Sequence, residues 1–200
     1  MPSTEEIQQY LTGAWRVVLG KPEGLRLLDV SADGFWNSFF AMVVAFPPLV
    51  VGWVGMSNEI AAFSGDFGSR LSIVARLATI DFAIWVVPVV ALALVARRAG
   101  LADRFVQLVV ASNWASALFV WATVPVPLLA MIWTMPPDVR NVLSLALLAL
   151  NIFVFWRITN VALGKGAAVA TAVFAGMFVL AVTIQILLMS AFGLSLGPAA

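Results

Sequence analysis

The sequence predicts an all-α, polytopic integral membrane protein with five transmembrane helices and amphipathic N-terminal helices at the membrane interface. The first observation is composition: 62% of the 200 residues are hydrophobic and 10% are charged, whereas soluble domains average about 45–50% and about 25%. The second is five apolar segments, each long enough to cross about 30 Å of hydrocarbon as a helix. The third is an N-terminal segment whose apolar residues recur at helical spacing.

Residues 1–34 are predicted to form a cytoplasmic amphipathic segment. Ser3 can cap a helix over residues 3–19, because Glu6 stands three positions later in a capping-box pattern. Glycines then interrupt the helical pattern, and Pro22 suits the first turn of a second short helix. The segment therefore predicts two short helices ahead of the membrane spans.

One face of the first helix is apolar and is formed by Ile7, Tyr10, Leu11, Ala14, Trp15 and Val18. The segment also carries residues that suit lipid headgroups: Trp15, Arg16, Lys21 and Arg26. Such a pattern is typical of helices that lie in the membrane interface. A helix that docks on the protein's own bundle explains the same pattern, and the two interpretations are compatible.

The membrane domain is predicted over residues 35–200. Its spans lie near residues 35–56, 71–96, 105–134, 141–162 and 167–192. Pro47-Pro48 is expected to break the first span and Pro88 the second, because proline lacks the backbone N–H that a helix needs. The third span is long and contains Pro125 and Pro127, so we expect it to kink or to end early and resume.

The distribution of basic residues predicts that the N-terminus is cytoplasmic and the C-terminus is outside. Cytoplasmic loops carry an excess of Lys and Arg. With this orientation eight basic residues lie on the cytoplasmic side: Arg16, Lys21, Arg26, Arg97, Arg98, Arg104, Arg157 and Lys165. Three lie on the other side: Arg70, Arg76 and Arg140. The group Arg97, Arg98 and Arg104 follows this rule and also suits anionic lipid headgroups.

Tryptophan and phenylalanine residues near the predicted span ends support these boundaries, because indole rings favour the headgroup level. The residues concerned are Phe35, Trp36, Trp53, Trp133 and Trp156.

Asp81 is the most informative residue of the spans. It lies near the middle of the second span, where an ionisable group costs several kcal/mol unless it is paired or hydrated. Arg76 lies five positions earlier and so on a different side of the helix. A partner is therefore expected from another span, either Asn113 or Asn151. Arg157 is expected to extend to the cytoplasmic interface.

Two interpretations of Asp81 stay open. In the functional one, Asp81 belongs to a proton or ion relay or to a small polar site, with Asn113, Asn151 and Arg76 in support. In the structural one, a hydrogen-bonded or protonated Asp81 fixes helix packing, since polar groups in membranes often act as contacts between helices. The absence of a second carboxylate within the spans favours the structural interpretation.

A stripe of small residues on the last span predicts a close helix contact. Ala168, Ala172 and Gly176 recur every four positions, a spacing that lets two helices approach each other closely. An internal contact is favoured, and a dimer face is the alternative.

Composition also excludes several classes of function. The 11 basic and 10 acidic residues nearly cancel, so no basic surface for nucleic acid is expected. The chain contains no Cys and no His, which excludes disulfides, Fe–S clusters and the usual zinc and copper sites. Mechanisms with a His base or a Cys nucleophile are excluded as well. We therefore predict no cofactor, no metal and no enzymatic activity.

The five spans, together with Phe46-Pro47-Pro48, Pro88 and the loop residues Arg97-Arg98, resemble the Yip1 family of membrane proteins over about residues 30–195. The Asp-Leu-Tyr-Gly-Pro motif of the eukaryotic branch is absent, so Rab-type partners are not carried over. The segments 14–24 and 33–39 are similar to small inner-membrane proteins of alphaproteobacteria, which implies a bacterial cytoplasmic membrane.

The sequence thus favours a non-enzymatic, Yip1-like organiser or adaptor, or an accessory subunit of a membrane complex. Membrane lipids and another membrane protein are the expected partners, and a homo-oligomer is left open. The alternative is a small transporter or channel that uses Asp81.

Overall fold

The computed structural model describes residues 1–61, 66–133 and 135–194, and all regular elements within these residues are helices. Residue 134, at the end of the predicted third span, and residues 195–200, at the end of the predicted membrane domain, lie outside the described residues. The elements are α1 (Thr4–Val18), the 3-10 helix η1 (Pro22–Leu27), α2 (Ala32–Ser38), α3 (Ala41–Ile60), α4 (Phe67–Ala96), α5 (Phe105–Thr123), α6 (Pro125–Ile132), α7 (Pro137–Leu163) and α8 (Ala167–Ala191).

The prediction of five membrane-spanning helices is confirmed. Within the described residues, five helical segments are long and apolar enough to cross a bilayer: Ala32–Ile60, Phe67–Ala96, Phe105–Ala130, Pro137–Leu163 and Ala167–Ala191. The first combines α2 with α3, and the third combines α5 with most of α6. The chain is therefore an all-α polytopic membrane protein.

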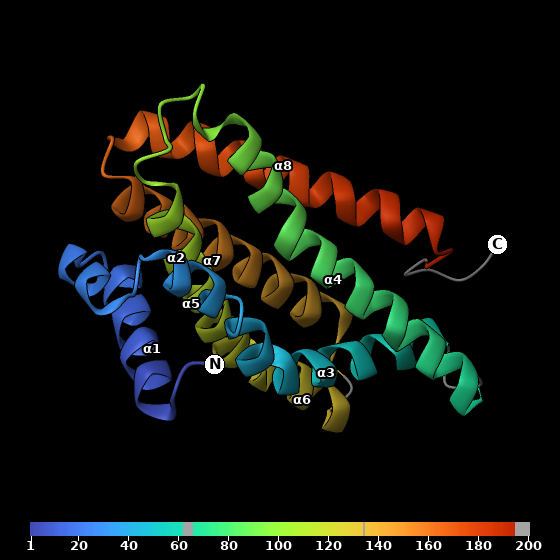
Figure 1. Ribbon diagram of the computed structural model, residues 1–200. Coiled ribbons are helices and arrows are strands. Elements are labelled where there is room, and N and C mark those ends of the chain that lie inside the picture. Colours follow the sequence, from blue (N-terminus) through green and yellow to red (C-terminus); the bar gives the residue numbers. More distant parts are fainter. Residues whose placement is uncertain (62–65, 134, 195–200) are drawn as a thin grey trace.

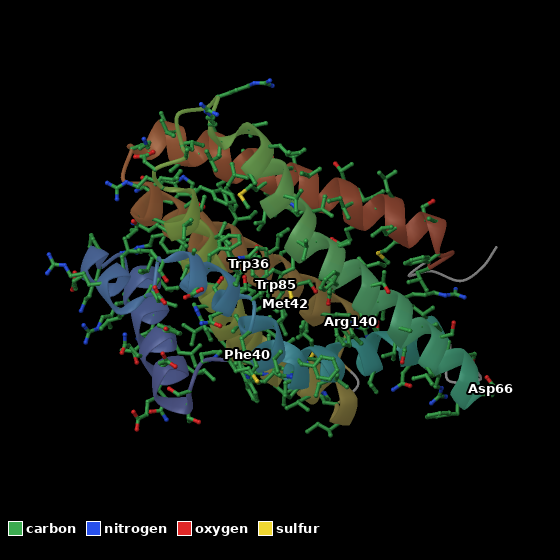
Figure 2. All side chains as sticks on the ribbon, viewed as in Figure 1. Trp36, Phe40, Met42, Asp66, Trp85 and Arg140 are labelled. Atoms are coloured by element: carbon green, nitrogen blue, oxygen red, sulfur yellow. The ribbon has the colours of Figure 1, made fainter. Side chains whose placement is uncertain are left out.

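The five long helices form a closed ring of neighbours that does not follow chain order. Helix α3 packs on α4, α4 on α8, α8 on α7, α7 on α5, and α5 again on α3. In Figure 1 the short helix α1 lies at one end of this bundle, beside α5. Figure 2 shows Asp66, at the start of α4, at the opposite end.

The breaks predicted at Pro47-Pro48 and at Pro88 are wrong, because α3 and α4 continue through these prolines. Pro48 has no N–H, which frees the carbonyl of Val44 four residues earlier. The indole of Trp121 on α5 donates a hydrogen bond of 2.9 Å to this carbonyl. A neighbouring helix thus replaces the missing backbone donor, as a helix in lipid requires.

The break predicted in the third span is confirmed, and the first span is interrupted at another place. Helix α5 ends at Thr123, and α6 begins with Pro125 in its first turn. In the first span, the interruption falls between α2 and α3, at residues 39 and 40.

The capping box at the start of α1 is confirmed. Glu6 N–H donates to the Ser3 hydroxyl at 3.2 Å, and Ser3 N–H donates to the Glu6 carboxylate at 2.7 Å. Pro22 begins the second short helix, as predicted, although η1 is a 3-10 helix.

The apolar face of α1 packs on the bundle, against α5 and α7. Tyr10, Ala14 and Val17 are buried there, and the Tyr10 and Trp114 ring centroids are 5.2 Å apart. Trp15 is 54% exposed and so lies outside the part of the face that packs on the bundle. Val17 is fully buried instead, and Gly24 of η1 packs beside it. The side chain of Trp15 remains free for lipid.

Helices α1 and η1 touch through Gly13 and Gly24. A methyl group at Gly24 would lie 2.5 Å from the Gly13 carbonyl oxygen and 2.7 Å from Arg16 Cβ. We expect Gly24→Ala to lower the free energy of unfolding by about 1–2 kcal/mol, because the two helices must move apart. Thermal unfolding in detergent measures this loss. Gly52→Ala is the matched control, since nothing lies within 4 Å of its added methyl group, and a loss equal to that of Gly24→Ala would contradict the close contact.

The stripe of Ala168, Ala172 and Gly176 faces outward, and all three residues are exposed. The expected internal contact is therefore wrong. Helix α8 turns a different face to the bundle: Ala170 is fully buried, and Val173 and Met177 pack against the core. The alternative of a dimer face stays a prediction.

A candidate intramembrane binding site

All five long helices line a cavity of about 400 Å³ at the centre of the ring. Helix α4 contributes Asp81, Trp85 and Pro88, and α5 contributes Ser112, Ser116 and Phe119. In both helices these residues recur at intervals of three or four, so that each set forms one face.

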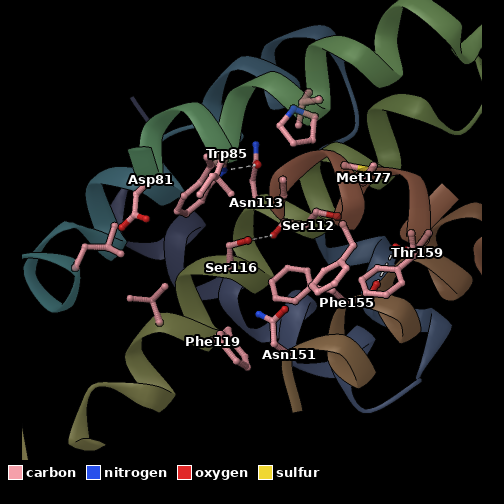
Figure 3. Close-up of a pocket in the computed structure, with 18 residues that line it drawn as sticks. Asp81, Trp85, Ser112, Asn113, Ser116, Phe119, Asn151, Phe155, Thr159 and Met177 are labelled. Carbon is pink, nitrogen blue, oxygen red and sulfur yellow. Dashed lines mark hydrogen bonds between the residues drawn. The ribbon is translucent and has the colours of Figure 1, made fainter. Parts of the chain in front are cut away.

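Helices α7 and α8 complete the wall of the cavity. Helix α7 contributes Asn151, Phe155 and Thr159, which follow one another at one-turn intervals. Helix α8 contributes Phe174 and Phe178, which are also one turn apart. Figure 3 shows Asp81 towards one end of the cavity and Thr159 towards the other. The cavity is mostly apolar and contains a few polar groups, which is the usual character of a small-molecule site.

Asp81 is bound by a tryptophan and not by an asparagine. The Trp53 indole N–H on α3 donates to a carboxylate oxygen of Asp81 at 2.6 Å. The expectation that Asn113 or Asn151 is the partner is wrong, because α4 lies beside α3 in the ring and Asn113 has other partners. Trp53 is only 9% exposed and binds Asp81 at the middle of α4, so its expected place at the headgroups is wrong as well.

Asn113 is at the centre of a separate buried network. Its side chain is 2% exposed, accepts a hydrogen bond of 2.8 Å from Trp85 and donates one of 2.9 Å to Ser38. This network joins α2, α4 and α5. Asn151 also lines the cavity, and its side-chain amide makes no hydrogen bond within the described part of the chain.

Arg76 and Arg157, the two arginines within the predicted spans, have partners other than Asp81. Arg76 donates to the carbonyl of Phe192, just after α8, at 2.9 Å, so its expected support of Asp81 is wrong. Arg157 donates to the carbonyl of Leu19 in the N-terminal segment and lies 5.7 Å from the centre of the Phe153 ring. Among the described residues, no Lys or Arg lines the cavity.

A second cavity of about 270 Å³ shares Asp81 with the first. Its wall includes Trp53, Thr123 and Gln185. Asp81 therefore contacts two cavities, and the Trp53 indole bound to it lines the second.

Ionic contacts hold the loops together at the end of the bundle that carries α1. Lys165 lies 2.9 Å from Asp103, and Arg104 lies 3.7 Å from the same carboxylate. The hydrogen bond with Lys165 lowers the pKa of Asp103, so the pair persists at neutral pH and is lost only as the pH falls through that lowered pKa. Gln107 also donates to the carbonyl of Ala162 at 3.0 Å. These contacts join α5 to the turn between α7 and α8.

The predicted headgroup residues are all exposed. They are Trp15, Arg16, Lys21, Arg26, Arg97, Arg98 and Arg104. Their contact with lipid stays a prediction.

Sequence reasoning missed Trp85 and Ser38, and it assigned Trp53 to the wrong environment. One available signal was the spacing of Asp81 and Trp85, which lie four residues apart on one helix face. Another was that a buried indole N–H usually finds a hydrogen-bond partner. Comparisons with protein-family models, curated proteins and solved structures find no match.

Proposed function

We propose that the protein is a small membrane transporter that carries a cation through the bilayer with Asp81 as the binding carboxylate. The observation that supports this function is an acidic side chain in the wall of a central cavity whose described lining contains no Lys or Arg. Ionisable residues within membranes often mark such pathways.

The charge of Asp81 must be neutralised from within the cavities. An ionised carboxylate in a low-dielectric interior is costly unless it is paired. Trp53 supplies a hydrogen bond but no positive charge, and Arg76 and Arg157 bind backbone carbonyls elsewhere. A proton or a cation that enters a cavity can neutralise Asp81. If Asp81 alternately binds a proton and a cation, the protein exchanges protons for cations across the membrane.

Proteoliposomes test this proposal. Vesicles with an acidic interior and a trapped pH dye are diluted into alkaline buffer that contains Na⁺, K⁺ or phenyltrimethylammonium. We expect at least one cation to speed the alkalinisation of the interior, because cation entry is exchanged for protons. Asp81→Asn should abolish the added rate, since the amide can neither bind a cation by charge nor carry a proton.

Asp103→Asn is the matched control, because this acid lies in an exposed loop outside the cavity. It should retain the rate. Equal rates with and without the protein for all three cations, or full activity of Asp81→Asn, would contradict the proposal.

The second candidate is a Yip1-like organiser or an accessory subunit in a bacterial cytoplasmic membrane. The observation that favours it is the exposed polar side of α1 and η1, which includes Gln8, Arg16 and Arg26. Native mass spectrometry from mild detergent should then find a stoichiometric partner, and Arg16→Glu with Arg26→Glu should release it. Deletion of residues 1–30 is unsuitable, since it would remove the buried Tyr10 and Ala14.

A further inference from the structure

We infer that the cation bound at Asp81 is organic: a small monocation with an apolar, ring-bearing body. The inference rests on the proposed cation transport and specifies the chemical class of the substrate. It follows from the charge, the ring content and the size of the central cavity.

The site carries one carboxylate, which matches a ligand with one positive charge. Asp81 is the only acidic side chain among the described residues that line either cavity, and neither lining contains a basic one. Ca²⁺ takes about six to eight oxygen ligands and Mg²⁺ about six, far more than a single carboxylate supplies. Among the described residues, no group of three or more His, Cys, Asp or Glu residues could hold a metal ion.

The other groups around the cavity suit an organic body better than a bare ion. Five aromatic rings from four helices contribute to the wall: Trp85, Phe119, Phe155, Phe174 and Phe178. Aromatic faces attract cations within about 6 Å and also cover apolar groups. A bare inorganic ion would instead need a shell of oxygen atoms in place of its water.

Two further features fit a ligand of modest size. The cavity volume of about 400 Å³ lies within the range of about 300–1,000 Å³ that is typical of small-molecule sites. Ser116 and Asn151 offer a hydroxyl and an amide across the cavity from α4, as Figure 3 shows. A molecule with its charge near Asp81 could therefore place a ring among the phenylalanines and a polar group near Asn151.

A matched pair of ligands tests the inference. Phenyltrimethylammonium and tert-butylbenzene have the same shape and differ in charge. We expect radiolabelled phenyltrimethylammonium to bind saturably to the full chain in lipid nanodiscs. An excess of tert-butylbenzene should displace little of it, because the neutral molecule gains nothing from Asp81.

Three variants show how much the charge of Asp81 and a phenylalanine ring each contribute to the affinity. Asp81→Asn should weaken binding roughly 30-fold or more, because it removes the charge pair. Phe178→Leu should weaken it about 3-fold through the loss of one ring face, and Asp103→Asn should leave it unchanged. A thermal-unfolding curve of wild-type shape checks that each variant is folded.

The outcomes separate this inference from the proposed function. If Na⁺ or K⁺ drives Asp81-dependent exchange while phenyltrimethylammonium neither binds nor drives it, the organic substrate is wrong and cation transport stands. If phenyltrimethylammonium binds through Asp81 but no cation drives exchange, the binding site stands and transport is wrong. Equal binding of the charged and neutral ligands would overturn the inference.

Discussion

Replacement of Asn113 by leucine is expected to lower the free energy of unfolding by about 2–3 kcal/mol, although the two side chains are similar in size. Asn113 accepts the Trp85 indole N–H and donates to the Ser38 hydroxyl. Leucine offers neither group, and a buried polar group that loses its partner costs about 1–3 kcal/mol. Unfolding in mixed micelles of increasing SDS content measures the change.

A double-mutant cycle shows whether the unpartnered indole causes the loss. Trp85→Phe removes the N–H and keeps an aromatic ring on α4. In the Asn113→Leu background this second change should therefore restore part of the lost stability, whereas in the wild type it should destabilise the protein. Strictly additive losses would show that Trp85 and Asn113 act independently and would contradict the network.

The sequence was sufficient to predict the features that depend on local pattern. The five spans are recognisable because each is a long apolar run, and bilayer thickness sets the length of a spanning helix. The capping box of Ser3 and Glu6 was recognisable because both partners lie within one helical turn. Pro125 ended α5 as predicted, since its ring suits a new first turn.

The partner of Asp81 could not be predicted, because it depends on the order of the helices around the ring. Helix α4 contacts α3 and α8 far more extensively than α5, and no local pattern encodes that order. The lipid preference of tryptophan predicts only a place at the headgroups. Trp53, Trp85 and Trp121 instead donate hydrogen bonds between helices, and a preference for lipid headgroups does not predict such bonds.

The effect of the prolines in α3 and the orientation of the small residues in α8 could not be predicted from the sequence for the same reason. Whether Pro48 breaks a helix depends on a donor from a neighbouring helix, here Trp121. Whether Ala172 and Gly176 face the core depends on how α8 is rotated. Both are properties of packing between segments distant in the sequence.

A cysteine at position 116 is expected to react almost completely with a membrane-impermeant maleimide that is present on both sides of the proteoliposome membrane. Ser116 lies in the cavity wall and is half-buried. A thiol reacts as its thiolate, which forms in water and not in lipid, so reaction reports that water reaches the cavity. The chain contains no Cys, so Ser116→Cys introduces the only thiol.

Two single-cysteine controls give the reaction rates of a water-exposed and a lipid-exposed thiol. Ala99→Cys lies in an exposed turn after α4 and should react fully once the reagent is present on both sides of the vesicle. Ala175→Cys lies on the exposed face of α8, outside both cavities, and should react poorly because lipid surrounds it.

The central claim, that Asp81 belongs to a cavity open to solutes from water, is tested most directly by this labelling with and without phenyltrimethylammonium. We predict that Ser116→Cys reacts at a rate close to that of Ala99→Cys, and that the cation slows the reaction only while Asp81 is present. If Ser116→Cys reacts as poorly as Ala175→Cys until the protein is unfolded in SDS, the cavity is closed to water. The proposed role of Asp81 would then be contradicted.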